Sequence, residues 1–334
     1  MEERTRLTLL AGDVGGTKTV LGLYDCWGEK LVCLDQAVFS SQCHDGLAEI
    51  VSEFLAWRAE RPVAACFGVA GPVEAGRSEI TNLPWVLTED GLSEATGIDR
   101  IRLLNDVQVM ALGLLHLEEG EWVELNPAAR RRPGNIAVIA AGTGLGEAIL
   151  YWDGKRHHAL PTEGGHCDFA PNTPLEDGLL TYLRERFGGH VSYERILSGT
   201  GLAHIYDYLR ACGTAPESEE LRAALSRVSD RAPVIRSWAL KHNDPLCNET
   251  LALFARIFGA EAGNLALKCL ALGGVFVGGG MAPRLLPVLR AGGFMNGFTY
   301  KGRFATLLKE LSVRVAIHPQ PALLGAAHAA MELI

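Results

Sequence analysis

Short apolar runs separated by glycine-rich turns dominate the first third of the chain and predict strands, while one longer segment has apolar residues at helical spacing. The predicted elements follow the order βββαβαβα. They cover residues 7–14, 19–25, 31–40, 46–60, 64–73, 88–97 and 101–117. The last of these ranges contains a strand and then a helix. This alternation of strands and helices is typical of an α/β domain.

The second half of the chain repeats this plan. Residues 135–144 and 146–154 predict two strands around a Gly-Thr-Gly turn, a helix-rich section covers 175–272, and residues 273–281 predict a strand that enters a triple-glycine turn. The closing segment, residues 323–334, predicts a helix that packs back on the first domain. Each half therefore opens with a strand, a glycine turn and a returning strand, without any strict short-period repeat.

The length, composition and net charge of the chain indicate what kind of protein it is. A chain of 334 residues, 48% hydrophobic and 21% charged, has room for two ordinary globular domains. The formal net charge of −8 offers no basic field for a phosphate backbone, so we expect no nucleic acid partner. The basic cluster Arg130 to Arg132 lies in a turn-rich stretch and is interpreted as a solvated loop.

Targeting signals and cysteine spacing point to the cytoplasm. No run reaches the roughly 18 apolar residues of a membrane span, and the N-terminus lacks the apolar stretch of a signal peptide. Eight scattered cysteines form no zinc-binding pattern and are expected to be reduced thiols. Cys167 stands inside a motif considered below and is expected near the site without taking part in the chemistry.

The two glycine turns do not fit the best-known nucleotide loops. The first, GDVGGTKT from Gly12, has the wrong glycine spacing for a Walker loop and continues into a strand rather than a helix. The second, AAGTGLGEAIL from Ala140, also continues into a strand, which excludes a Rossmann fingerprint. Bare backbone N–H groups, with hydroxyls from Thr17 and Thr143, can instead form an anion nest. The alternative is that each turn is only a hairpin connection.

Two carboxylates stand where burial would be costly. Asp13 ends the first strand at the mouth of the hairpin, where a hydrated magnesium ion is a plausible partner. Asp106 follows Asn105 at the end of an apolar strand. Its alternative role is to cap the helix that follows.

A second polar cluster lies further along the chain. Glu163 and His166 flank two glycines, and a carboxylate and an imidazole on such a loop can both face a polyhydroxylated ligand. Glu194 stands at the opening of a predicted helix, where an acid favouring the helix dipole is the alternative interpretation.

These segments together resemble the bacterial hexokinase-type glucokinases, the non-repressor kind, within the superfamily of actin, sugar kinases and Hsp70-like ATPases. The matching segments, in the family's order and spacing, are DVGGTKT, LLNDVQVMALGL, AAGTGLGEA, PTEGGHCDFAPN, SYERILSGTGL and GGVFVGGGMAPR. EGGH with DFAP, and ERILSG, are specific to this kinase group. The cysteine-rich zinc motif and N-terminal DNA-binding helices of the related repressors are missing.

The resemblance implies an α/β fold of the actin-like ATPase (ribonuclease H-like) type, with two α/β domains around a central cleft. The small domain is expected to contain residues 1–114 and 315–334, and the large domain residues 115–314. The family also implies a homodimer, glucose and ATP as ligands, and Mg²⁺ as the metal.

Site residues follow from the same resemblance. The sugar is expected to be held by Asn105, Asp106, Glu163, His166 and Glu194. The ATP phosphates are expected against Gly15, Gly16, Thr17 and Lys18 and against Gly142, Thr143 and Gly144, while Gly278, Gly279 and Gly280 border adenosine and Asp13 faces the metal through water.

The implied reaction transfers the γ-phosphoryl group of MgATP to the 6-hydroxyl of glucose, giving glucose 6-phosphate, with Asp106 as general base. A non-catalytic sugar or nucleotide sensor on the same scaffold, and a kinase of another hexose, are the alternative hypotheses. The sequence leaves open the phosphoryl donor among ATP, ADP and polyphosphate, and the role of Lys18.

Overall fold

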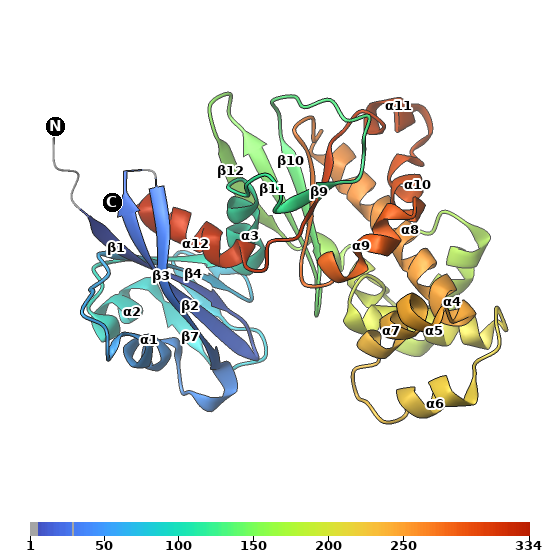
Figure 1. Ribbon diagram of the computed structural model, residues 1–334, viewed down its shortest axis with the longest axis horizontal. Coiled ribbons are helices and arrows are strands. Elements are labelled where there is room, and N and C mark those ends of the chain that lie inside the picture. Colours follow the sequence, from blue (N-terminus) through green and yellow to red (C-terminus); the bar gives the residue numbers. More distant parts are fainter. Residues whose placement is uncertain (1–5, 29) are drawn as a thin grey trace. The chain divides into compact units, whose positions relative to one another are not determined.

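The computed structural model describes residues 6–28 and 30–334. The chain forms two compact units, which Figure 1 shows coloured along the sequence. The first unit takes the described part of Met1–Glu119 together with Ala159–Pro161 and His318–Ile334, and the second takes Gly120–His158 and Thr162–Ile317.

The first unit is built on a five-stranded sheet in the order β3-β2-β1-β4-β8. Its elements are β1 (Leu7–Val14), β2 (Lys18–Trp27), β3 (Lys30–Ser40), α1 (Leu47–Leu55), β4 (Ala64–Val69), β5 (Val73–Glu74), β6 (Arg77–Glu79), β7 (Val86–Thr88), α2 (Glu89–Thr96), β8 (Arg100–Asn105), α3 (Asp106–Leu114) and α12 (Pro321–Met331). The first three strands are antiparallel, whereas β1, β4 and β8 are parallel.

Both faces of the strands β1, β2 and β4 are buried, which explains the continuous apolar runs of these strands, whereas the edge strand β3 is mostly exposed. Leu10 on β1 packs into the cluster that contains Ile50 and Phe54 of α1. Its neighbour Leu9 points to the opposite cluster, where Leu323 and several alanines of α12 cover the sheet. The predicted C-terminal helix is therefore present, and it packs on the first unit.

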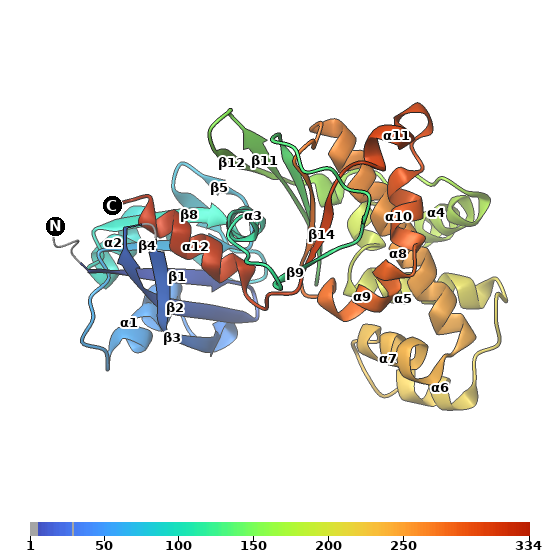
Figure 2. The ribbon, with the colours of Figure 1, turned by 45° about the horizontal axis from the view of Figure 1, so that its top comes forward.

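Helices α3 and α12 lie side by side in Figures 1 and 2 because glycines allow their backbones to touch. A β-carbon built on Gly113 would lie 1.8 Å from the carbonyl oxygen of Pro321, and one on Gly325 would lie 1.8 Å from that of Val109. No side chain fits at either position without separating the helices.

The second unit is built on a six-stranded sheet in the order β12-β11-β10-β13-β14-β9. Its elements are β9 (Trp122–Glu124), β10 (Ile136–Ala141), β11 (Leu145–Trp152), β12 (His157–Thr162), α4 (Pro174–Phe187), α5 (Gly199–Ala211), α6 (Glu219–Leu225), α7 (Ala232–His242), α8 (Pro245–Lys268), β13 (Gly274–Gly278), α9 (Leu286–Arg290), α10 (Gly293–Thr299), α11 (Ala305–Leu308) and β14 (Val313–Ala316). Two short 3₁₀ turns, η2 (Gly164–His166) and η3 (Tyr193–Arg195), carry predicted site residues.

The two sheets share one arrangement. In each, an antiparallel hairpin (β1–β2 or β10–β11) is followed across the sheet by two parallel strands. The duplication predicted from the glycine turns is confirmed. The long helix α8 follows Asp244, whose side chain caps it by accepting the N–H of Cys247, and it is buried along most of its length in the core of the second unit.

The sequence pattern missed the shortest strands. The small sheet β5-β6-β7 and the strands β9 and β14 were not predicted, because two to four residues are too few to show a clear period. The six-residue β12 was not predicted either, and its sequence HHALPT has no apolar run. Of these strands, β14 pairs with β13 and with β9, which are distant from it in the chain.

We expect Gly325→Ala to destabilise the protein by about 2 kcal/mol, the cost of overpacking a tight contact. Alanine favours a helix over glycine by only about 1 kcal/mol, so the clash with Val109 prevails. Urea unfolding measures the change. Gly46→Ala is the control, because a β-carbon there meets nothing within 4 Å. A Gly325→Ala variant as stable as the parent would contradict the close contact.

Candidate active site

The turn of the first hairpin is closed by its own backbone and by Ser41, the residue directly after β3. The N–H of Gly15 donates to the carbonyl of Lys18 at 3.0 Å, and the Ser41 hydroxyl donates to the carbonyl of Gly15 at 2.7 Å. The side chains of Thr17 and Lys18 are exposed. A fixed backbone with exposed donors suits an anion site.

Protein contacts account for part of the glycine requirement in this turn. A β-carbon on Gly16 would lie 3.0 Å from the carbonyl oxygen of Thr81, and one on Gly15 would lie 3.2 Å from that of Lys18. The interpretation as a plain hairpin connection therefore explains these two glycines to some extent.

Asp13 lies half-buried at the end of β1. Burial raises the pKa of its carboxyl, and the positive charge of Lys18 opposes that shift. Asp13 pairs with Gly68 on β4, and Gly68 pairs with Leu104 on β8. Asp13 and Leu104 are therefore two strand spacings apart, roughly 10 Å.

Asn105, and not Asp106, caps helix α3. The side-chain oxygen of Asn105 accepts the N–H groups of Val107 at 3.0 Å and Gln108 at 3.3 Å, while its amide donates to the carbonyl of Gly71. Asp106 is the first residue of the helix, half-buried, and its Oδ1 lies 2.8 Å from the N–H of Val107. The capping role considered for Asp106 thus belongs mainly to its neighbour.

In the second unit, the turn after β10 is closed by its own backbone and is bonded to the segment that contains Glu194 and Gly199. The N–H of Gly142 donates to the carbonyl of Gly144 at 2.8 Å, and the carbonyl of Gly142 accepts the N–H of Gly199 at 3.0 Å. The Glu194 carboxylate accepts the N–H of Leu145 at 3.0 Å. Thr143 at the tip is exposed.

Glu194 is not in the first turn of helix α5. It lies in the short turn η3, and Ser198 caps α5 instead, so the helix-dipole alternative for Glu194 is wrong. Its carboxylate lies against the glycine turn, because a β-carbon on Gly144 would lie 2.4 Å from its Oε2.

At two glycine positions of these turns, Gly142 and Gly280, no packing contact requires the absence of a side chain. A β-carbon on Gly142 or Gly280 would meet nothing within 4 Å, and neither residue has a positive φ. By contrast, Gly279 has a φ of +82°, and a β-carbon built on it would lie 2.3 Å from the carbonyl oxygen of Ala141. Gly278 is buried at the end of β13. The open space at Gly142 and Gly280 is available to a ligand.

Glu163 and His166 lie on an exposed loop, with Nε2 of His166 3.9 Å from Oε2 of Glu163. The loop closes through the N–H of His166, which donates to the carbonyl of Glu163 at 3.0 Å. Gly165 is required because a β-carbon there would lie 2.0 Å from the carbonyl oxygen of Leu145 on β11. Cys167 is exposed and free.

The structure thus gathers the candidates into two groups, one in each unit. In the first unit, the hairpin turn, Asp13, Asn105 and Asp106 lie at the carboxyl edge of the parallel strands. In the second, the turns at 142–144 and 278–280, the loop with Glu163 and His166, and Glu194 lie around the ends of β10 and β13 and the start of β11.

Two features of the structure were not predicted from the sequence. A hollow of about 330 Å³ at the start of α5 is lined by Gly199, Thr200, Ala203, His204, Ser229, Asp230 and Arg231. The signal for it was the second Gly-Thr-Gly, at 199–201, directly after a helix cap. The other is Glu147, a buried acid within β11.

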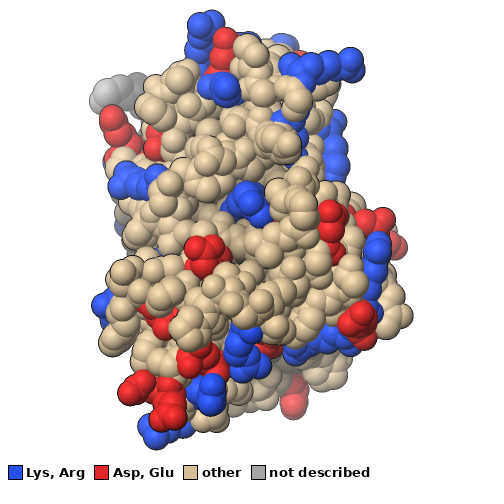
Figure 3. Space-filling model, turned by 90° about the vertical axis from the view of Figure 1, so that its right-hand side faces the viewer, with Lys and Arg blue, Asp and Glu red and all other residues tan. Residues whose placement is uncertain are grey.

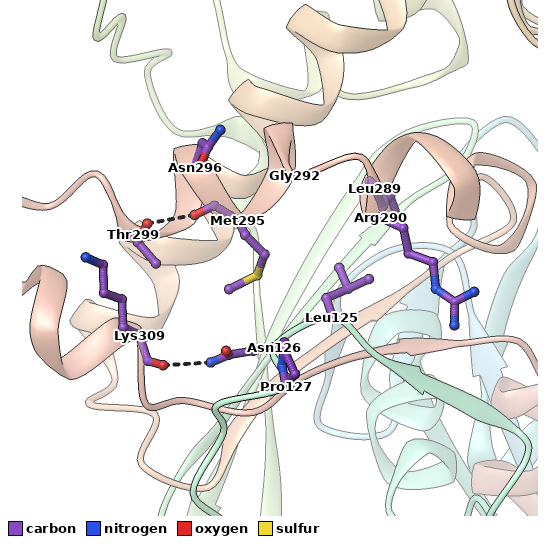
Figure 4. Close-up of a pocket in the computed structure, with 10 residues that line it drawn as sticks. All are labelled: Leu125, Asn126, Pro127, Leu289, Arg290, Gly292, Met295, Asn296, Thr299 and Lys309. Atoms are coloured by element: carbon purple, nitrogen blue, oxygen red, sulfur yellow. Dashed lines mark hydrogen bonds between the residues drawn. The ribbon is translucent and has the colours of Figure 1, made fainter.

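A second hollow of about 330 Å³ contains none of the predicted residues. Figure 4 shows Leu125, Met295 and Arg290 among its walls, with the Asn126 amide donating to the Lys309 carbonyl at 2.9 Å. It is not part of either group of candidates.

Surface charge shows no single-sign field on the face drawn in Figure 3, where basic and acidic side chains are interspersed. Among the described residues, no helix combines the length and apolar composition that crossing a lipid bilayer requires.

Known proteins are similar to this chain over almost its whole length. The sequence profile of the Glucokinase family matches residues 10–333. A glucokinase of Nostoc punctiforme is 38% identical and aligned over 97% of this chain and 99% of its own.

Solved structures agree. A glucokinase from an Antarctic psychrotroph superposes with a TM-score of 0.84 at 30% identity, covering 97% of this chain and 99% of its own. A ROK family glucokinase from Streptomyces griseus, in complex with glucose and AMPPNP, has a TM-score of 0.65 at 20% identity over 97% of this chain and 99% of its own. The expected actin-like ATPase fold is thereby confirmed. This chain belongs to the glucokinase family, whose members are ATP-dependent kinases of glucose.

Proposed function

We propose that this chain transfers the γ-phosphoryl group of MgATP to the 6-hydroxyl of glucose, giving glucose 6-phosphate, with Asp106 as the general base. The observation that carries the proposal is the carboxyl edge of the first sheet. There Asn105 is the N-cap of helix α3, Asp106 is its first residue, and Asp13 occupies the same edge two strands away. We assign the first of these two carboxylates to the acceptor hydroxyl and the second to the metal.

The base has a defined task. A sugar hydroxyl is a weak nucleophile at neutral pH, so Asp106 takes its proton as the bond to the γ-phosphorus forms. A positioned general base contributes roughly a hundred- to ten-thousandfold. Asn105, whose amide has a second hydrogen beyond the one given to Gly71, can donate to a sugar oxygen beside it.

Backbone donors and hydroxyls supply the charge stabilisation. Phosphoryl transfer has a loose transition state and depends mainly on alignment and electrostatics. The turn at Gly15, Gly16, Thr17 and Lys18 and the turn at Gly142, Thr143 and Gly144 are proposed to bind the phosphates. The space beside Gly142 and Gly280 supports this assignment, because a side chain at either position would occupy it.

The metal fits the chemistry of Asp13. Burial disfavours the charged form of this carboxyl, and a nearby cation would restore it. Mg²⁺ commonly binds through one or two carboxylates with waters and substrate phosphates, so a lone acid that faces it through water suffices. When bound, the ion would neutralise charge on the phosphates.

The nucleoside is proposed to lie between the glycine turn at 278–280 and the hollow at the start of α5. Both border the end of β10: Met281 donates its N–H to the carbonyl of Ala141, and Gly199 donates to that of Gly142. In the hollow, the Asp230 carboxylate is a suitable acceptor for ribose hydroxyls.

Sugar contacts are proposed from both units: Asn105 and Asp106 from the first, and Glu163, His166 and Glu194 from the second. Division of the contacts between two domains, residues 1–114 with 315–334 and residues 115–314, lets the sugar itself drive closure. Closure then excludes water, the competing acceptor.

The setting of the enzyme is proposed from the family and its substrates. We place it in the cytoplasm, where ATP is available and where its eight cysteines, all free in the structure, stay reduced. A homodimer is proposed from the family resemblance, and light scattering of the purified protein measures it.

We expect Asp106→Asn to lower kcat by roughly a hundred- to ten-thousandfold, because the variant cannot accept the proton. Glucose binding, measured by calorimetry, should persist within a fewfold. The control is Asp99→Asn, an exposed acid just before β8. Unchanged turnover would refute the base, and absence of turnover on any hexose in the parent, with binding retained, would favour a sensor.

Glu163→Gln should raise the KM for glucose about tenfold or more, with a smaller effect on kcat. The substitution removes a charge-assisted hydrogen bond, worth about 1.5–3 kcal/mol. Steady-state kinetics with glucose, mannose and fructose measures the effect and the hexose range. Glu185→Gln, an exposed acid on α4, should leave the KM unchanged.

Gly142→Ala should raise the KM for ATP at least tenfold without lowering the thermal midpoint, because the added methyl enters open space where the phosphates are proposed. Gly279→Ala, by contrast, should lower the midpoint, since its backbone has a positive φ. A normal KM for ATP in the Gly142→Ala variant would remove this turn from the site.

A further inference from the structure

A buried acid lies directly beneath the loop of Glu163 and His166. Glu147 on β11 is 1% exposed, and among the described residues neither oxygen of its carboxyl has a hydrogen-bond partner. A β-carbon built on Gly164 would lie 2.1 Å from Oε2 of Glu147. The carboxyl therefore touches the loop backbone between the two proposed sugar ligands.

The loop is also tied to the backbone of Glu147. The Thr162 hydroxyl donates to the carbonyl of Glu147 at 2.9 Å, and the N–H of Gly164 donates to that hydroxyl at 3.1 Å. The conformation of the loop therefore depends on this one position of β11 through both its main chain and its side chain.

Helix α8 supplies the charged groups behind Glu147. Glu261 is fully buried and accepts hydrogen bonds from Asn264 at 2.7 Å and from Lys268 at 3.3 Å. The single positive charge of Lys268 is thus engaged by Glu261. Burial, followed by the negative charge of Glu261, raises the pKa of Glu147 to about 8, and Lys268 only partly opposes this.

Within the part of the chain that the structure describes, the other elements packed around this cluster bring no cation to Glu147 by hydrogen bond. Tyr193 of η3 accepts from Asn264, and Lys301 donates to the other end of the same amide at 2.6 Å. The loop above carries the exposed side chains of Glu163, His166 and Cys167.

We propose that Glu147 is a positioning residue of the sugar-binding loop: its neutral carboxyl supports the backbone at Gly164 in the conformation that presents Glu163 and His166, and its ionisation displaces that loop. This inference rests on the proposed function of those two residues.

The direction of the effect follows from desolvation. A buried carboxylate without donors is unfavourable, and it gains water most readily where its cover can move. The cover is the loop, whose Glu163 and His166 are exposed while only Gly165 between them is buried, whereas β11 and α8 are held by the core. The loop is therefore in place while Glu147 is protonated, below about pH 8, and is displaced as the pH rises through that value.

The test is the KM for glucose at saturating MgATP between pH 6.5 and 9.5. If only the protonated form binds sugar, the KM of the parent enzyme rises about tenfold between pH 7 and 9, while kcat changes little. Glu147→Gln has a neutral side chain of the same shape, so its KM should stay flat. Glu249→Gln, at an exposed position of α8, should keep the parent profile.

A flat KM in the parent enzyme overturns the inference without any variant, so it stays testable even if Glu147→Gln fails to fold. Glu163→Gln in the same assay separates the two proposals. If Glu163→Gln leaves the KM unchanged, the sugar assignment fails. If it raises the KM while Glu147→Gln retains the alkaline rise, only the role of Glu147 is refuted.

Discussion

The backbone at the tip of the β10–β11 hairpin is the constraint on which the candidate site of the second unit depends. Ala141 accepts the N–H of Met281, Gly142 accepts that of Gly199, and Leu145 donates to Glu194. Two segments far from this turn in the sequence, one with Glu194 and Gly199 and one with Met281, are thus fixed to five consecutive residues. Because these bonds involve mainly backbone groups, the turn can dispense with side chains, and its exposed surface stays free for a ligand.

The candidate site residues of the first unit are also held by distant segments, through strand register and helix packing. Its edge is set by the register of three parallel strands, and Asn105 satisfies the first N–H groups of α3. The helix itself is held by α12, which the chain supplies from its far end through the contact at Gly325. The placement of Asp106 therefore depends on residues more than two hundred positions away.

The glutamates of the second unit differ in the hydrogen-bond donors and charges around their carboxyl groups, which the neighbouring residues in the sequence do not reveal. Glu194 is stabilised by a backbone donor, Glu261 by an amide and an ammonium group, and Glu147 by neither. Glu163 is exposed to solvent. Four glutamates within one unit thus have four environments, and this difference allows them different roles.

The sequence by itself determined the hairpins, the main strands and helices, the duplicated plan and the identity of most candidate residues. Those features depend on local periodicity and on glycine, threonine and acidic residues in short motifs such as EGGH. Only the tertiary structure decided that Asn105 caps α3, that Glu194 lies against Gly144, that Gly142 is bare without a packing reason, and that Glu147 is buried without a partner. These properties are set by contacts between segments distant in the chain, and a local pattern of residues does not encode which segments will meet.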